Sequence, residues 1–289
     1  MIFLENDRLR VGVRTQGAEL TSIFHKPTAT EHLWQADPAV WGWHAPNLFP
    51  VVGGCLDNLL RINGRTYPTE RHGFARHSEF SLVESTPERA VFSLPFSEKT
   101  LAVYPYRFEF QIRYDLTGDT LGVTYRVLNL DAQPVFFSVG AHPALNVPFG
   151  PDEDYEDYFL EFETDEPLTT HLLSPNGLFS GETAPVPTEN GQLRLTKHLF
   201  DRDALVFKNL LSRKLTLGSD RHDRRVTVEF PDFNYLGLWA KPGAPFVCIE
   251  PWLGCADSEG RAMDISEKEA IQRVEVGGIF EATFSIRLA

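Results

Sequence analysis

The chain has 289 residues, of which 42% are hydrophobic and 23% charged, a balance typical of soluble globular proteins rather than disordered or fibrous ones. Its formal net charge is −13 and no Lys/Arg-rich run interrupts the acidity, which argues against a nucleic-acid partner because phosphate binding needs clustered positive charge. The N-terminal residues lack the basic start and apolar run of a signal peptide, and no run of 18 uncharged apolar residues occurs. We therefore expect a cytoplasmic protein with no membrane partner.

The three cysteines give no sign of a disulfide framework or a metal centre. Cys55, Cys248 and Cys255 are odd in number and lack CxxC spacing, so we expect reduced thiols that act as small core residues. The sequence also contains no Walker loop, Rossmann fingerprint, GxSxG elbow or HExxH motif. These absences remove several common enzyme classes, and no metal is expected.

Alternating apolar residues predict β-strands from one end of the chain to the other. Leu9, Val11 and Val13 open the pattern, which is the period of a strand with one buried face. A TGDT turn between two later strands predicts a hairpin. The predicted strands that follow the first lie within residues 89–96, 106–116, 120–130, 134–142, 192–200, 213–219, 224–230, 235–241, 245–250 and 281–288.

Helical periodicity is nearly absent from the sequence. Only residues 37–43 and 198–205 suggest a short helical turn. The 20 prolines and 21 glycines fit a protein rich in loops. Regularly spaced strands without long helices between them favour an all-β antiparallel sandwich or barrel. Because no repeat or linker interrupts the pattern, we expect one domain over residues 1–289.

The first candidate site segment is the run HGFAR, which holds His72, Gly73 and Arg76. Glycine lets the backbone turn without a side chain, so a neighbouring histidine can approach a ligand closely. On the residues alone, His72 is equally a surface-loop histidine, and Arg76 is equally a partner for a nearby carboxylate.

The second candidate is His142, which ends the strongly apolar stretch PVFFSVGAH and is followed by Pro143. A polar group at the end of a buried strand is well placed to face a cleft. The ordinary pKa of histidine lies near neutrality, which suits it to proton transfer. A histidine satisfied within the core or a turn explains the residue equally well.

The third candidate, Glu250, is the sharpest local anomaly of the sequence. It follows the apolar run PFVCI and precedes Pro251 and Trp252. Burying an unpaired charge is costly, so this carboxylate must be paired or functional. Trp252 and Trp239 offer flat faces that suit the C–H side of a sugar ring, although most tryptophans are packing residues. Asp201 and Asp203, in a short loop between apolar stretches, fit the ordinary role of turn or cap residues.

Taken together and in this order, the segments resemble the galactose mutarotase-like aldose 1-epimerases, in particular the LacX-like branch. The resemblance spans nearly the whole chain. It is carried by GAELTSI, LWQADPAVWGWHAPNLFPVVG, HGFAR, FSVGAHPALN, DALVF and YLGLWAKPGAPFVCIEPWLGCADSEG. It implies a large antiparallel β-sandwich of the galactose mutarotase-like type, a small-molecule sugar substrate, and neither a metal nor an organic cofactor.

The resemblance also implies roles for five residues. The proton-donating histidine of the family matches His142, its general base matches Glu250, and a second sugar-contacting histidine matches His72. Arg76 matches a substrate or phosphate contact of related hexose-phosphate mutarotases, and Asp203 matches an aspartate that binds sugar hydroxyls. In the reaction so implied, Glu250 takes the proton of the anomeric hydroxyl while His142 protonates the ring oxygen. The ring opens, the aldehyde rotates, and reclosure gives the other anomer.

Two other functions compete with epimerisation. A carbohydrate-binding protein without turnover would use the same scaffold, although the presence of His142 and Glu250 argues against it. A glycoside hydrolase or lyase is the third possibility, because fold alone does not fix function. Hydrolysis usually needs two carboxylates about 5–10 Å apart, and no second acid of comparable context stands out.

One position departs from the family pattern and leads to a prediction about the substrate. Many relatives carry an arginine where this chain has Gly54, so a cation that would hold a phosphate is missing. We therefore expect neutral sugars to be exchanged at least as well as their 6-phosphates. NMR anomer exchange against the spontaneous rate, over free hexoses, pentoses and 6-phosphates, measures this. A 6-phosphate with a kcat/KM about tenfold above that of every neutral sugar would show the expectation to be wrong.

Overall fold

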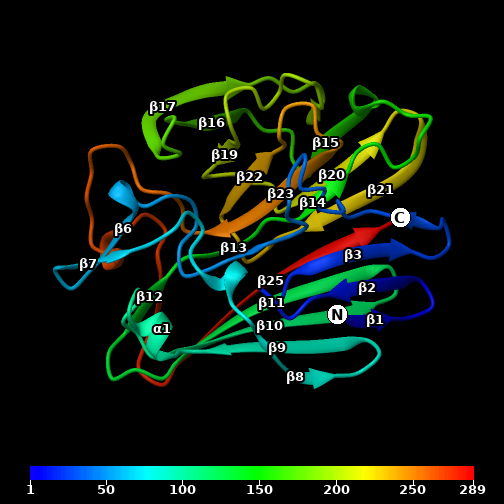
Figure 1. Ribbon diagram of the computed structural model, residues 1–289. Helices are drawn as coiled ribbons and strands as arrows, with labels where there is room; N and C mark the ends of the chain where they lie inside the picture. Colours follow the sequence, from blue (N-terminus) through cyan, green and yellow to red (C-terminus); the bar gives the residue numbers. More distant parts are fainter.

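The computed structural model describes residues 1–289 and consists almost entirely of strands and loops (Figure 1). The strand pattern of the sequence is confirmed along most of the chain. Two segments differ from it. Residues 134–142 form two short strands in different sheets, and residues 192–200 form a strand only at Gln192–Arg194. No helix in the structure has the length and hydropathy required to cross a membrane.

The largest sheet has nine antiparallel strands. The alternation in β10 is strict, with every second side chain of Phe108–Leu116 buried. A two-residue turn, in which Gly118 has φ +57°, joins β10 to β11. The strands run in the order β18 (Gln192–Arg194), β15 (Tyr158–Phe162), β20 (Lys214–Ser219), β21 (His222–Glu229), β25 (Ile279–Leu288), β11 (Thr120–Asn129), β10 (Phe108–Thr117), β9 (Arg89–Pro95) and β8 (Ser81–Ser85).

A second sheet of six strands carries Glu250. Its central strand β23 is buried at all eight positions, which explains the continuous apolar run in the sequence. The order is β19 (Leu205–Phe207), β22 (Tyr235–Trp239), β23 (Phe246–Leu253), β13 (Val139–Ala141) and β5 (Asn47–Leu48), with β14 (Ala144–Asn146) also paired to β23.

Smaller sheets and turns complete the fold. They comprise β1 (Ile2–Glu5), β2 (Leu9–Val13), β3 (Leu20–His25) and β4 (Thr30–Glu31) in one sheet, and the pairs β6 (Leu59–Ile62) with β7 (Arg65–Pro68), β12 (Val135–Phe137) with β24 (Gln272–Val274), and β16 (Leu168–Leu173) with β17 (Phe179–Val186). The one α-helix is α1 (Glu98–Leu101), and 3-10 turns occur at Leu56–Asn58, Ala75–His77, Tyr155–Asp157 and Ile265–Glu267.

Neither of the two segments suggested as helical turns extends into a helix. Residues 37–43 and 198–204 form turns and bends. In the first segment, the backbone N–H groups of Val40 and Trp41 both donate to the carbonyl of Asp37, at 2.9 and 2.8 Å. This is a single helical turn, as the sequence suggested, and the chain does not continue it.

The nine-stranded and six-stranded sheets face each other across a common core of 70 buried residues. Phe49, just after β5, stacks on Phe110 of β10 with 4.4 Å between ring centroids. The hydroxyl of Tyr125 on β11 donates to Oδ1 of Asn47 on β5 at 2.7 Å. This arrangement is a β-sandwich, as the strand pattern predicted, and it leaves the other face of the six-stranded sheet to form a cavity.

Trp252 of β23 lies flat on that other face because glycines occupy the neighbouring strands. A Cβ atom at Gly140 of β13 would lie 2.6 Å from Cδ1 of the indole, and one at Gly237 of β22 would lie 2.5 Å from its Cζ2. The residue is 7% exposed, and its indole borders the cavity. The two glycines therefore fix the position of a flat aromatic surface.

We predict that Gly237→Ala lowers the thermal stability and moves this indole. Overpacking a filled core costs about 1–3 kcal/mol, which corresponds to a fall in Tm of a few degrees. Gly122→Ala is the matched control, since it lies in strand β11 and its nearest Cβ contacts are at 3.8 and 3.9 Å. Thermal unfolding and near-UV circular dichroism report both effects. Equal stability of the two variants would show that Trp252 does not depend on Gly237.

Candidate active site

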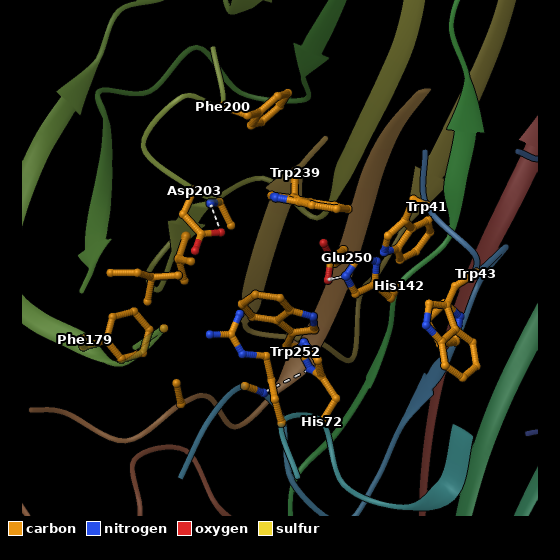
Figure 2. Close-up of a pocket in the computed structure, with 18 of the residues that line it drawn as sticks. Trp41, Trp43, His72, His142, Phe179, Phe200, Asp203, Trp239, Glu250 and Trp252 are labelled. Carbon is orange, nitrogen blue, oxygen red and sulfur yellow. Dashed lines mark hydrogen bonds and ion pairs between the residues drawn. The ribbon is translucent and has the colours of Figure 1, made fainter. Parts of the chain in front are cut away.

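The register of β23 brings an acid and a base together. Gly140 pairs with Trp252 and Ala144 pairs with Cys248. Between these two pairs the ladder is interrupted, and His142 lies level with Glu250. Residues opposite each other in antiparallel strands point to the same face. As a result, Nε2 of His142 and Oε2 of Glu250 are 3.2 Å apart. Figure 2 marks this contact with a dashed line.

Aromatic rings surround this pair and bury it. The indole of Trp41 stacks on the imidazole of His142 with 5.1 Å between centroids, and Trp239 meets the same ring edge-on at 5.8 Å. A third ring, that of His72, lies at 5.7 Å. Only 9% of His142 and 1% of Glu250 are exposed to solvent.

The enclosure shifts both ionisation equilibria toward the uncharged forms. Burial raises the pKa of Glu250 well above its ordinary 4.5, and the nearby charge of Asp203 raises it further. Burial lowers the pKa of His142 to about 3. Removal of water disfavours charge on either group. A carboxylic acid beside a neutral imidazole holds the same number of protons as a carboxylate beside an imidazolium, so the pair titrates as one unit.

His72 is held as a hydrogen-bond donor toward the cavity. Its Nδ1 accepts a hydrogen bond from the backbone N–H of Gly53 at 3.1 Å. Burial lowers the pKa of His72 well below its ordinary value, so the ring is neutral. A neutral imidazole that accepts at Nδ1 carries its proton on Nε2.

The backbone at His72 adopts a left-handed conformation, and the adjoining Gly73 packs closely against another loop. His72 has φ +68°, a conformation unusual for a residue with a side chain. At Gly73, which has φ +69°, a Cβ would meet the carbonyl oxygen of Phe49 at 2.4 Å. The glycine of the HGFAR motif is therefore required by close packing against the loop after β5, and this packing positions His72.

Two arginines from the same loop reach the cavity without a carboxylate partner within ion-pair distance. Arg76 lies over the ring of Trp43 at 5.4 Å and donates to the backbone carbonyl of Arg71 at 2.8 Å. Burial lowers the pKa of Arg76, although arginine stays charged at neutral pH. Arg71 itself donates to the carbonyl of Asn176 at 3.1 Å.

Asp203 supplies a carboxylate on the opposite wall. It follows Phe200 in a loop before β19, has φ +76°, and accepts a hydrogen bond from the N–H of Ala204 through Oδ1 at 2.8 Å. Its second oxygen faces the cavity with no ion-pair partner in the protein. A non-glycine residue with positive φ beside a cavity is a conformation that often marks a functional site.

One cavity of about 530 Å³ collects these groups. All five residues singled out by the sequence line it, namely His72, Arg76, His142, Asp203 and Glu250. Trp239 and Trp252 line it as well. The sequence analysis missed Arg71, Trp41 and Trp43. The adjacency of Arg71 to His72 was an available signal for the first, whereas nothing in the sequence separates Trp41 and Trp43 from packing tryptophans.

The comparison with known proteins agrees with the geometry. Residues 1–258 match the model of the family described as aldose 1-epimerase. The chain belongs to the aldose 1-epimerase family. The protein LacX, chromosomal, of Lactococcus lactis subsp. lactis is 35% identical over 282 residues, which cover 94% of either chain.

Solved structures related to this aldose 1-epimerase family member share its fold over the full length. A galactose mutarotase related enzyme from Lactobacillus acidophilus superimposes with a TM-score of 0.94 at 31% identity, covering 100% of this chain and 97% of the other. A galactose mutarotase-like protein from Lactobacillus casei ATCC 334 gives 0.94 at 32% identity, covering 100% of both chains. The LacX-like assignment and the galactose mutarotase-like sandwich are thus both confirmed.

Proposed function

We propose that this family member is an aldose 1-epimerase (mutarotase) that interconverts the α and β anomers of a sugar by acid–base catalysis. The observation that carries the proposal is the 3.2 Å separation of Nε2 of His142 and Oε2 of Glu250, two buried groups on the wall of one cavity. The two oxygens that exchange protons during anomerisation are bonded to the same sugar carbon. An acid and a base side by side can therefore reach both of them.

The proposed cycle begins when the shared proton moves to His142, leaving Glu250 as a carboxylate. Glu250 then takes the proton of the O1 hydroxyl, the C1–O5 bond breaks, and His142 gives its proton to O5. The sugar is now an open-chain aldehyde, and the pair is a carboxylic acid beside a neutral imidazole. This is the form that burial favours, so the enclosure assists ring opening. Rotation about C1–C2 and reversal of both proton transfers give the other anomer.

The remaining lining residues fit the binding of a neutral polyol. Nε2–H of His72 and the guanidinium of Arg76 are donors to sugar oxygens, and the free oxygen of Asp203 is an acceptor for sugar hydroxyls. The indoles of Trp239 and Trp252 offer flat apolar faces for the C–H side of the ring. The cytoplasmic location expected from the sequence stays a prediction.

We further assign to Arg71 the anchoring role that Gly54 cannot perform. A Cβ at Gly54 would lie 3.2 Å from Cδ2 of Leu178, and 3.6 and 3.9 Å from the carbonyl oxygens of Gly177 and Asn176. The guanidinium of Arg71 occupies the same surroundings, because it bonds the carbonyl of Asn176 and fills the space beside Gly177. A cation from a different loop thus lies close to position 54, where the family pattern has an arginine.

We predict that Glu250→Gln and His142→Asn each lower kcat by about 10²- to 10⁴-fold, since each removes one partner of the proton transfers. Sugar binding should largely survive, and the two losses should be strongly non-additive because the groups act as a unit. NMR anomer exchange and calorimetric sugar binding on folded variants measure both quantities. Glu267→Gln and His77→Asn, at exposed positions outside the cavity, are the matched controls.

The same experiment separates catalysis from simple sugar binding. Near-wild-type exchange in either variant would contradict the role given to that residue. Sugar binding by the wild-type chain without any acceleration of anomer exchange would instead identify a carbohydrate-binding protein on the same scaffold.

Arg71→Ala is predicted to raise KM about 10- to 100-fold with a smaller change in kcat, because a hydrogen bond from a charged donor contributes about 1.5–3 kcal/mol. Arg202→Ala, at an exposed position of the loop before β19, is the control. Adding Gly54→Arg to Arg71→Ala should recover part of the affinity by returning a cation to this wall. An unchanged KM in Arg71→Ala would remove Arg71 from the binding site.

A further inference from the structure

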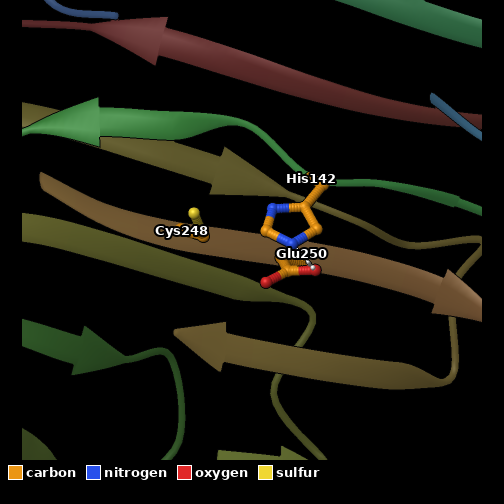
Figure 3. Close-up of side chains that lie close together, drawn as sticks. All are labelled: His142, Cys248 and Glu250. Atoms are coloured by element: carbon orange, nitrogen blue, oxygen red, sulfur yellow. Dashed lines mark ion pairs between the residues drawn. The ribbon is translucent and has the colours of Figure 1, made fainter. Parts of the chain in front are cut away.

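A thiol lies beside the acid–base pair and has no part in the proposed reaction. Cys248 and Glu250 are two residues apart on β23, so their side chains point to the same face of the sheet. His142 lies level with Glu250 in the interrupted ladder between β13 and β14. One ligand atom from each of the three residues lies within 4.8 Å of the other two, and all three residues are buried (Figure 3).

The polar atoms of this cluster have few partners in the protein. Nδ1 of His142 is buried and makes no hydrogen bond. Oε2 of Glu250 is also buried, and its one polar contact is the 3.2 Å approach of Nε2 of His142. Cys248 is a free thiol, fully buried. Buried polar atoms are almost always satisfied in folded proteins, and those that are not commonly mark a ligand or catalytic site. Proton transfer to a sugar accounts for Glu250 and one nitrogen of His142, but it gives no role to the sulfur.

The chemical types of the three groups select a class of cation. Mg²⁺ and Ca²⁺ take oxygen ligands, whereas a set of one thiolate, one imidazole and one carboxylate suits Zn²⁺. Zinc–ligand distances are about 2.0–2.3 Å. The three ligand atoms therefore have to move closer together, by up to about one ångström, to share one ion. His142 and Glu250 line the cavity, so an ion held by the three groups can take water or a sugar oxygen from the cavity as its fourth ligand.

We propose that His142, Cys248 and Glu250 form a binding site for a thiophilic divalent cation, with Zn²⁺ as the fitting ion, and that its occupation inactivates the acid–base pair. Binding displaces the thiol proton of Cys248 and the proton shared by the pair, and both protons go to solvent. The ion then holds the lone pairs that accept protons from the sugar. The inhibitory part of this inference rests on the proposed epimerase function, whereas the binding part does not.

Cobalt(II) is the probe for binding, because its thiolate complexes absorb light. Titration of the metal-stripped full-length chain with Co²⁺ should give a sulfur-to-cobalt charge-transfer band that Zn²⁺ removes by competition. Cys248→Ala should abolish the band and weaken Zn²⁺ binding by ~10-fold or more, since even groups that only support ligands contribute 10- to 100-fold. Cys255→Ala, at another buried cysteine outside the cluster, should keep the band. Circular dichroism checks that each variant is folded.

His142→Asn serves as the second binding variant if Cys248→Ala does not fold, and it should also lose the band. A wild-type chain without the band, or an unchanged band in the folded Cys248→Ala or His142→Asn variant, overturns the proposal. Neither outcome depends on epimerase activity, so this failure is distinct from a failure of the proposed function.

Activity tests the inhibitory part. Exhaustive chelation should leave anomer exchange unchanged or higher, because organic groups perform both proton transfers. Zn²⁺ should inhibit the wild-type and Cys255→Ala chains, and inhibition of Cys248→Ala should need at least about ten times more Zn²⁺. Loss of activity on chelation that Zn²⁺ restores would contradict an inhibitory site, as would equal inhibition of all three chains.

Discussion

Glu250 occupies the middle of a strand that is buried on both faces, and its only ion-pair partner in the protein is His142. An isolated charge at such a position would be strongly unfavourable, so the histidine must remain within reach of it. The rest of the site is organised around this requirement. The ladder breaks between β13 and β14 at the level of Glu250, which frees the His142 side chain to face the carboxyl group.

The positions on either side of Glu250 are adapted to the same geometry. Its partner on β22 is Gly237, which leaves room for the Trp252 indole next to the carboxyl group. Trp41 and Trp239 close the other sides of the imidazole. Burial shifts both pKa values toward the neutral forms, so a carboxylic acid beside a neutral imidazole is favoured over an ion pair. The same face of β23 places the Cys248 thiol within 4.8 Å of a ligand atom of His142 and of Glu250.

Charge on the cavity walls is divided between two loops. His72, Arg71 and Arg76 come from the segment after β7, and Asp203 comes from the segment before β19. His72 and Asp203 both adopt positive φ, and neighbouring packing maintains the first of these through Gly73 against Phe49. Polar side chains from two loops therefore surround the part of the sheet that holds His142 and Glu250.

The sequence by itself determined the all-β class, most strands, and the identity of the unusual residues. Alternation is a local property, so the spacing of apolar side chains alone predicts β10 and β11. A glutamate in the apolar run before Trp252 is likewise recognisable as unusual from the sequence alone. The motifs that carried the family resemblance are local as well, and they brought His72, Arg76, His142 and Asp203 into consideration.

Tertiary structure alone decided which of these residues meet. The approach of His142 to Glu250 depends on strand register across 108 positions of sequence, and register is set by long-range packing that local patterns do not encode. The sequence analysis missed Arg71 for the same reason. The contacts that place its guanidinium, with Asn176 and Gly177, come from a distant loop. Cys248 looked like a small core residue in the sequence, and only the shared face of β23 placed its sulfur beside an imidazole and a carboxyl group.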